Sequence, residues 1–234
     1  MAIFVLVHGA WAGGWGYKHV ARRLRAAGHE VYTPSLTGLG ERAHLLSGDI
    51  DLSTHIADVA NVFLYENINN VILVGHSYGG MVVTGVASEC ANRIRTLVYL
   101  DAFLPEDGQS LWDIASEQGR DMYIRNQRDT PGMVTPMLFP GQREEGRTSS
   151  RPPNSHPLLT LTQPVKLSGA EKSIKNRTYI LANKMQPAGF QRFYDKIKAL
   201  NDASWRLATI ATGHVVMSED PEGLSKLLLE EVAR

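Results

Sequence analysis

The sequence has little that would point to a disulfide scaffold, a membrane protein or a nucleic-acid partner. It carries one cysteine, Cys90, in 234 residues, so no intrachain disulfide can form. Lys and Arg together number 24, as do Asp and Glu, and the formal net charge is zero. There is no basic stripe interleaved with aromatic residues, as a nucleic-acid-binding surface would need. No apolar run approaches the length of about 20 residues that a membrane-spanning helix requires.

The start of the chain also lacks the marks of a targeting segment. The run "AIFVLVHG" is short, has no basic region before it and is followed by no signal-cleavage pattern. Together with the lone cysteine, this fits a reducing compartment. We expect a soluble, cytoplasmic protein with no membrane partner.

Short apolar, β-branched runs alternate along the chain with longer amphipathic ones. Several of the short runs are apolar throughout, which is typical of parallel strands that are covered on both faces. Alternating strands and helices predict an α/β fold with a mostly parallel sheet flanked by helices. We expect one domain over residues 1–234. The expected strands are 3–9, 30–36, 70–77, 94–103, 178–183 and 205–212.

One region interrupts this alternation. Residues from about 104 to 175 contain no convincing strand, and 140–157 are rich in Pro, Gly, Ser and Arg. A plain loop of that length inside a compact domain would be unusual. We therefore expect a small lid over the carboxyl edge of the sheet, inserted before the strand at 178–183.

The segment "VILVGHSYGGMVV" contains the pattern G-x-S-x-G, with an expected strand before it and an expected helix after it. This is the context in which the pattern marks a nucleophilic serine on a tight strand-to-helix turn. Gly75 and Gly79 would leave room for the turn, because a Cβ there would crowd the strand against the helix. The sequence thus predicts Ser77 as a nucleophile.

A serine hydroxyl needs a base to remove its proton. In this arrangement the base is a histidine late in the chain, after the last strand. His214 follows the expected strand 205–212 and precedes the final helix, whereas the other seven histidines lie in or beside early turns, on helices, in the lid or inside the glycine motifs. We predict that His214 is the general base.

Acyl transfer also needs two N–H donors for the oxyanion that forms. One comes from the residue after the nucleophile and the other from a loop after an early strand. In this chain these are Tyr78 and, in "VHGAWAGGW", Ala10. We expect the backbone N–H groups of both residues to face the reacting carbonyl.

The segments "FVLVHGAWAGGW", "LVGHSYGG" and "TGH" resemble the α/β-hydrolase superfamily. Within it, the chain resembles the group that contains plant methylesterases and hydroxynitrile lyases, and this resemblance covers almost the whole chain. "LVYLDAFLPEDGQSLWD" resembles its bacterial esterase branch, which includes hydrolases of pyrethroid and carbamate esters. The resemblance implies a serine esterase with a lid and no cofactor or metal, often a homodimer. It implies a small, fairly apolar ester or carbamate as substrate.

Two alternatives to an esterase are a lyase and a non-catalytic receptor. Lyases of this group carry a threonine where this chain has Gly9, and a lysine after the catalytic histidine, where this chain has Val215. Both differences disfavour a lyase. A non-catalytic small-molecule receptor on the same fold stays open, because one fold hosts unrelated functions.

The acid that should orient His214 is missing from its usual place. In most relatives it follows the strand matching 178–183, near Met185, where Asn183 and Lys184 cannot serve. The carboxyl end of a neighbouring parallel strand offers Asp101 instead, an arrangement that resembles one type of haloalkane dehalogenase. Glu106, Asp107 or a dyad without an acid remain alternatives. Glu219 and Asp220 are disfavoured, because Asp220 before Pro221 is explained as a helix cap.

The residues that shape the substrate pocket are the hardest to predict from the sequence, because many belong to the lid. Four residues are expected beside the reacting groups because they neighbour them in the chain or in the lid. These are Trp11, Phe103, Trp112 and Val215.

Overall fold

The computed structural model describes residues 1–127, 131–136, 155–184 and 189–234. Its centre is a six-stranded sheet with the order β2-β1-β3-β4-β7-β8, and every neighbouring pair of strands is parallel. The mostly parallel α/β architecture expected from the sequence is therefore confirmed. The strands are β1 (Ile3–Val7), β2 (Glu30–Tyr32), β3 (Val71–His76), β4 (Ile94–Leu100), β7 (Asn176–Ala182) and β8 (Trp205–Ile210).

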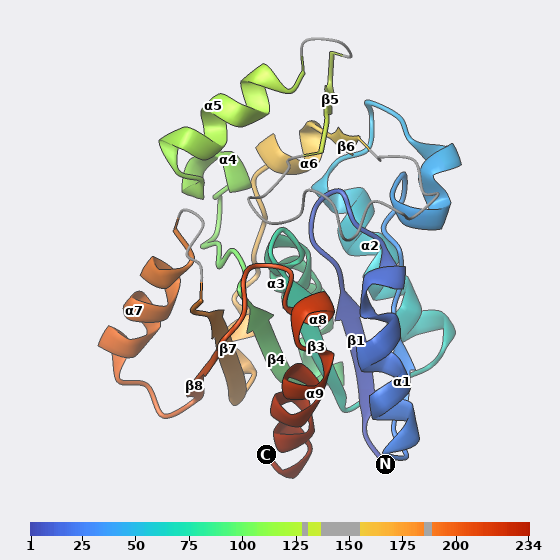
Figure 1. The fold of residues 1–234 in the computed structure, drawn as a ribbon, viewed down its shortest axis with the longest axis vertical. Helices are drawn as coiled ribbons and strands as arrows, with labels where there is room; N and C mark the ends of the chain where they lie inside the picture. Colours follow the sequence, from blue (N-terminus) through green and yellow to red (C-terminus); the bar gives the residue numbers. More distant parts are fainter. Residues whose placement is uncertain (128–130, 137–154, 185–188) are drawn as a thin grey trace.

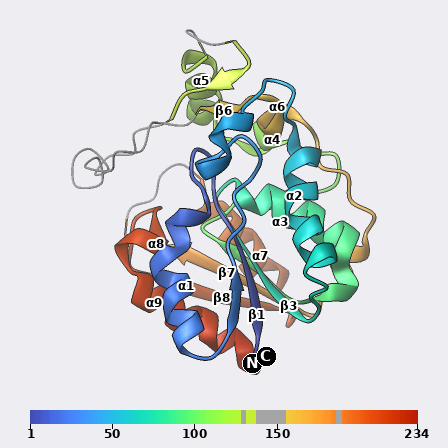
Figure 2. The same cartoon turned by 90° about the vertical axis from the view of Figure 1, so that its right-hand side faces the viewer.

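Helices cover both faces of the sheet (Figures 1 and 2). Residues of α2 (Leu52–Tyr65), α3 (Gly79–Cys90) and α7 (Gln191–Leu200) pack on one face. Residues of α1 (Lys18–Ala26), α8 (Val216–Glu219) and α9 (Pro221–Glu230) pack on the other. The short 3-10 helices are η1 (Gly14–Tyr17), η2 (Gly40–Leu45), η3 (Ala91–Arg93), η4 (Ala170–Ser173) and η5 (Glu231–Ala233).

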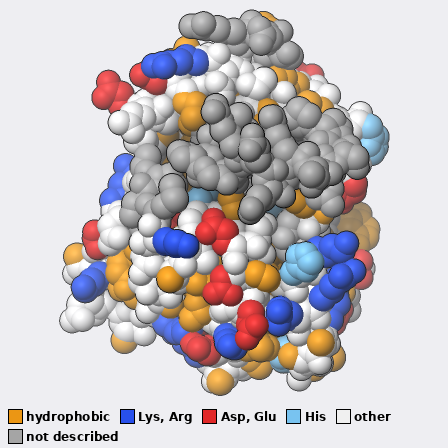
Figure 3. All heavy atoms as spheres, viewed as in Figure 1, with side chains coloured by type: hydrophobic (Ala, Val, Ile, Leu, Met, Phe, Trp, Pro, Cys, Tyr) orange, Lys and Arg blue, Asp and Glu red, His pale blue; other side chains and the backbone are white. Residues whose placement is uncertain are grey.

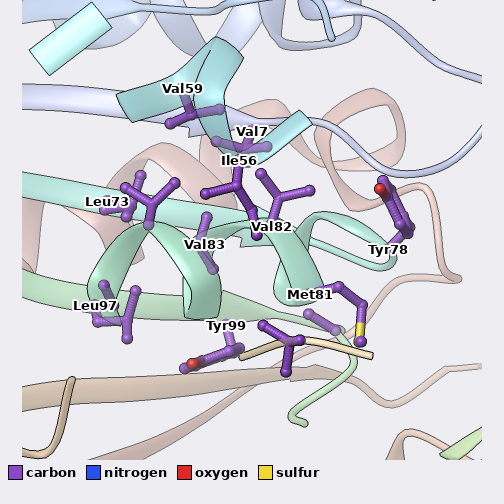
Figure 4. Packing of buried hydrophobic residues seen from close by; sticks show 14 of the residues in the cluster. Val7, Ile56, Val59, Leu73, Tyr78, Met81, Val82, Val83, Leu97 and Tyr99 are labelled. Carbon is purple, nitrogen blue, oxygen red and sulfur yellow. The ribbon is translucent and has the colours of Figure 1, made fainter. Parts of the chain in front are cut away.

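The central strands divide their side chains between two hydrophobic clusters. Successive residues of a strand point to opposite faces, so Leu73 joins the cluster under α2 and α3 while Val74 joins the cluster under α1 and α9. Figure 4 shows part of the first cluster, where Val82 and Val83 of α3 lie close to Ile56 of α2. Burial on both faces explains why these strands are apolar throughout.

Between β4 and β7 the chain leaves the sheet and forms a layer beyond the carboxyl ends of the strands (Figure 1). We call the described part of residues 101–175 the excursion. It contains one feature that the sequence analysis did not predict, a two-stranded antiparallel sheet of β5 and β6. With two residues each, these strands are too short to show a hydrophobic period. The elements are α4 (Leu111–Ile114), α5 (Glu117–Arg125), β5 (Met133–Val134), β6 (His156–Pro157) and α6 (Leu159–Thr162).

The surface carries charges of both signs. On the face seen in Figure 3, Lys and Arg side chains alternate with Asp and Glu side chains over the part of the molecule that holds the sheet. None of the described helices has the length and apolar character needed to cross a bilayer.

Candidate active site

Ser77 occupies the turn between β3 and α3 and has a backbone φ of +55°. A non-glycine residue in this left-handed region is strained, and such strain clusters at functional sites. The turn requires the backbone at Gly75 and at Gly79, on either side of Ser77, to pack closely against neighbouring carbonyl groups. A Cβ on Gly75 would lie 2.6 Å from the Gly79 carbonyl oxygen, and one on Gly79 would lie 2.8 Å from the His8 carbonyl oxygen. Gly75 thus lets strand approach helix, whereas Gly79 lets the helix approach the end of β1.

Asp101 leaves the sheet beside Ser77. His76 pairs with Leu100 in the β3–β4 ladder, so the next residues, Ser77 and Asp101, emerge from adjacent strands at the same level. Asp101 also has a positive φ, +43°, and is only 1% exposed. Its Oδ1 accepts a hydrogen bond from the Ala182 N–H at 3.2 Å. A buried carboxylate needs such donors, since an unpaired one would be costly.

The other carboxylate oxygen of Asp101 contacts His214. Oδ2 lies 2.7 Å from Nδ1 of His214, whose side chain follows β8 and is almost as deeply buried. Because an ionised carboxylate only accepts, Nδ1 carries the hydrogen and donates it. Nε2 is then the ring nitrogen that carries no hydrogen and can accept a proton. Phe190 stacks on the imidazole with ring centres 5.0 Å apart and planes 10° from parallel.

A second histidine, His76, holds the backbone of His214. Its Nε2 lies 2.8 Å from the His214 carbonyl oxygen, and a carbonyl can only accept, so Nε2–H donates. Burial lowers the pKa of His76 well below its usual value, and the neighbouring His214 lowers it further. His76 is therefore neutral, which the donation from Nε2 allows. The sequence pattern did not single out this role, because His76 lies inside the glycine motif.

The two expected oxyanion donors come from two segments that are distant in the sequence. Ala10 belongs to the loop after β1, and Tyr78 precedes the first residue of α3. Neither of their backbone N–H groups donates a hydrogen bond to another described residue. Both residues line the same cavity as Ser77 and His214. The next residue of the loop, Trp11, has a φ of +57°.

A cavity of about 170 Å³ joins these groups. Its walls are mostly aromatic and aliphatic, and no Asp, Glu, Lys or Arg is present among its described lining residues. Three of the four expected pocket residues, Trp11, Phe103 and Val215, line it, and the excursion contributes Leu111, Met122, Tyr123 and Leu161. Trp112 is outside this lining and packs partly buried against the core. Phe190 was missed, because it lies 24 residues from His214 and no motif marks it.

The alternative acids have other partners. Glu106 pairs with Lys196, and Asp107 accepts a hydrogen bond from the Leu167 N–H at 2.8 Å. Asp220 caps α9 by accepting from the Gly223 N–H at 2.7 Å, as predicted. Glu219 accepts from the Gly213 N–H at 2.7 Å and so braces the loop before His214.

The usual place for the acid is only partly described. The side chains of Asn183 and Lys184 are exposed, and their backbone N–H groups donate to the carbonyl oxygens of Ile210 and Thr212. Met185 lies outside the described residues. Among the described residues no cluster of His, Cys, Asp and Glu has the arrangement of a metal site.

Comparison with known proteins identifies the family to which the chain belongs. A carbendazim hydrolyzing esterase from Nocardioides sp. (strain SG-4G) is 40% identical over 97% of this chain and 98% of its own length. Methyl jasmonate esterase 1 from Vitis vinifera is 29% identical over 75% of this chain and 71% of its own. The solved structure of an extracellular alpha/beta-hydrolase from a Paenibacillus species superposes with a TM-score of 0.81 at 22% identity, covering 99% of both chains. The pattern of the alpha/beta hydrolase family matches residues 4–227, and the chain belongs to that family.

Proposed function

We propose that the protein is a serine esterase that hydrolyses small, neutral, largely apolar carboxylic esters or carbamates through a covalent acyl-enzyme. The observation that carries the proposal is the contact between His214 Nδ1 and Asp101 Oδ2 at 2.7 Å, beside a serine on a strained turn in an apolar cavity. The similarity to a carbendazim hydrolyzing esterase supports ester or carbamate cleavage.

The reaction begins when Ser77 Oγ attacks the substrate carbonyl carbon and His214 Nε2 takes the serine proton. The carbonyl oxygen becomes an oxyanion, which the N–H groups of Ala10 and Tyr78 bind. Asp101 holds the Nδ1–H tautomer and stabilises the imidazolium that forms. His214 then gives its proton to the leaving alcohol, and the acyl or carbamoyl group stays on Ser77.

Water completes the cycle by the same route in reverse. His214 takes a proton from a water molecule, the resulting hydroxide attacks the acyl-enzyme, and the proton returns to Ser77 as the acid leaves. The neutral walls of the cavity suit this chemistry on a neutral substrate, because a charged group would lose its hydration without gaining a partner.

The excursion is proposed to act as a lid over this cavity. Leu111, Met122, Tyr123 and Leu161 of the excursion line the cavity. They belong to α4, α5 and α6, which lie beyond the carboxyl ends of the strands (Figure 1). An apolar wall there excludes water from the oxyanion and strengthens its hydrogen bonds. Neither alternative function has a specific observation in its favour.

The proposal also covers the cellular location and the oligomeric state of the protein. A cytoplasmic location fits the single cysteine, and a homodimer fits the resemblance to esterases of this group. Cell fractionation and light scattering of the purified protein test these two points.

Turnover of p-nitrophenyl acetate and of an aryl methyl carbamate tests the function. Wild-type protein should hydrolyse at least one of them, and Ser77→Ala should reduce kcat on the order of 10⁴-fold or more. Ser173→Ala, on the exposed 3-10 helix η4, is the matched control and should keep wild-type kinetics. Ligand binding without turnover across an ester panel would instead indicate a receptor.

A further inference from the structure

A buried histidine of the excursion, His156, contacts both Tyr78 and Trp11, the residue after Ala10. Its ring is 4.8 Å from that of Tyr78, at 76°, and 5.7 Å from that of Trp11. The side chain is fully buried. His156 belongs to β6, far from the other two residues in sequence, so only the fold brings them together.

Hydrogen bonds determine which nitrogen of His156 carries the proton. The Thr160 hydroxyl donates its only hydrogen to the Pro157 carbonyl oxygen at 2.7 Å, and it lies 2.8 Å from His156 Nε2. The hydroxyl therefore accepts from Nε2–H. That leaves Nδ1 as an acceptor, and the backbone N–H of Trp11 donates to it at 3.4 Å. Burial lowers the pKa of His156 well below its usual value, with His55 and His8 lowering it further, so the ring is neutral.

The small sheet of the excursion therefore holds Trp11 at two points. His156 of β6 accepts from the Trp11 backbone, and the Val134 carbonyl of β5 accepts from the indole Nε1–H at 2.8 Å. Val134 and His156 are themselves paired in the β5–β6 ladder. Trp11 needs such restraint, since its φ of +57° is strained for a side chain of this size.

Tyr78 is held from the other side. Its hydroxyl lies 2.9 Å from His55 Nδ1, and His55 Nε2 donates to the Thr37 carbonyl oxygen at 3.0 Å. Nδ1 of the neutral His55 ring therefore accepts, and the Tyr78 hydroxyl donates. The Tyr78 ring is thus fixed between His55 and His156, which leaves its backbone little freedom to turn.

We propose that His156 is a positioning residue for the reaction at Ser77: it fixes the Trp11 backbone and the Tyr78 ring, and so aims the N–H groups of Ala10 and Tyr78 at the oxyanion. This rests on the proposed function. Because oxyanion hydrogen bonds strengthen in the transition state, loss of their aim lowers kcat and leaves substrate binding nearly unchanged.

Two substitutions separate this role from packing. His156→Asn places an amide oxygen near the position of Nδ1 and keeps an acceptor for the Trp11 N–H, whereas His156→Leu fills similar space without one. On p-nitrophenyl acetate, His156→Leu should lower kcat at least about 10-fold with KM within about threefold of wild type. His156→Asn should keep kcat within about threefold of wild type. Affinity for a trifluoromethyl ketone, which forms an oxyanion on Ser77, should fall in parallel with kcat.

Equal kcat in both variants, whether at the wild-type level or equally reduced, would overturn the proposal, as would a change in KM alone. Thermal unfolding checks that each variant is folded. If His156→Leu does not fold, the ¹⁵N chemical shifts of the His156 ring in the wild-type protein test the proposal, because they report its tautomer. A neutral Nε2–H tautomer at pH 7 supports the proposal, and an Nδ1–H tautomer or an imidazolium contradicts it. Failure of the esterase proposal is separate, since it would appear as absent turnover in the wild type.

Discussion

His214 Nδ1 and Asp101 Oδ2 lie 2.7 Å apart although the two residues are 113 positions apart in the chain. β4 delivers Asp101 and the loop after β8 delivers His214, and both are buried. A carboxylate in this place can orient an imidazole and stabilise its protonated form, so we propose that β4 supplies the acid of the site.

Replacing Asp101 with asparagine tests that assignment. Asp101→Asn keeps the shape of the side chain but favours the wrong His214 tautomer, and we expect kcat to fall on the order of 10³- to 10⁴-fold. Glu106→Gln and Asp107→Asn are matched controls, because both carboxylates are exposed and have other partners. Steady-state kinetics on p-nitrophenyl acetate measure the effect. A folded Asp101→Asn protein with unchanged kcat would remove Asp101 from the mechanism.

Crowding at Gly9 should damage the nucleophile directly. A Cβ at this position would lie 2.9 Å from Ser77 Cβ and 3.1 Å from His76 Nδ1. Gly9→Ala must therefore displace Ser77 or the oxyanion loop slightly. Because a displacement of about 1 Å costs on the order of 10²-fold in rate, we expect this smaller displacement to lower kcat by less than that but measurably. Gly48→Ala, where an added Cβ meets nothing within 4 Å, serves as control. Equal activity of the two variants would show that the site tolerates the added methyl group.

The neutral cavity should discriminate against charged substrates. Methyl 4-nitrobenzoate and monomethyl terephthalate have nearly the same shape, but the second carries a carboxylate. No Lys or Arg among the described lining residues could pair with it. We expect kcat/KM to be at least about 10-fold lower for the charged ester, because its carboxylate would lose hydration in the cavity. Chromatography of the acid products measures both rates, and equal values would contradict a neutral pocket.

Buried neutral histidines should make the fold sensitive to mild acid. Burial lowers the pKa of His8 to about 4, against 6.5 for an exposed histidine. The unfolded chain then binds a proton that the folded chain does not, so stability falls as pH falls from 6.5 towards 4. For His8 alone the loss at pH 5 relative to pH 8 is about 2 kcal/mol.

Urea unfolding at several pH values measures this effect. His8→Gln keeps an acceptor for the Leu36 N–H and cannot titrate, so its free energy of unfolding should depend less on pH than that of the wild type. His19→Gln, on the exposed face of α1, should not change the slope. The same slope in all three proteins would mean that His8 does not contribute to the acid sensitivity.

The sequence predicts those features that depend on a local pattern of residues. Continuous apolar runs identified the central strands, because strands buried on both faces have no polar positions. Asp101 was conspicuous for the same reason, as an acid at the end of an apolar strand. The predicted strand 205–212 is two residues longer than β8, which ends at Ile210. Ala211 and Thr212 continue the strand-like sequence pattern but do not pair with β7.

Contacts between segments that are distant in the chain could not be predicted from the sequence. The sequence places His156 in a loop-like lid, whereas the structure buries it against Trp11, which lies 145 positions away. Phe190 precedes α7 and shows no motif, and its stacking on His214 depends on how α7 docks against β7 and β8. Such environments are created by tertiary packing, which neither hydrophobic period nor motif encodes.

Covalent labelling of Ser77 tests the central claim most directly. Diethyl p-nitrophenyl phosphate phosphorylates an activated serine and displaces p-nitrophenol, and mass spectrometry of the digested protein locates the adduct. Activation of Ser77 by His214 predicts one diethylphosphoryl group per chain on the peptide that contains Ser77, loss of esterase activity in proportion to labelling, and no adduct in His214→Ala on the same timescale. An adduct on another residue, or full activity in a protein labelled at Ser77, would contradict it.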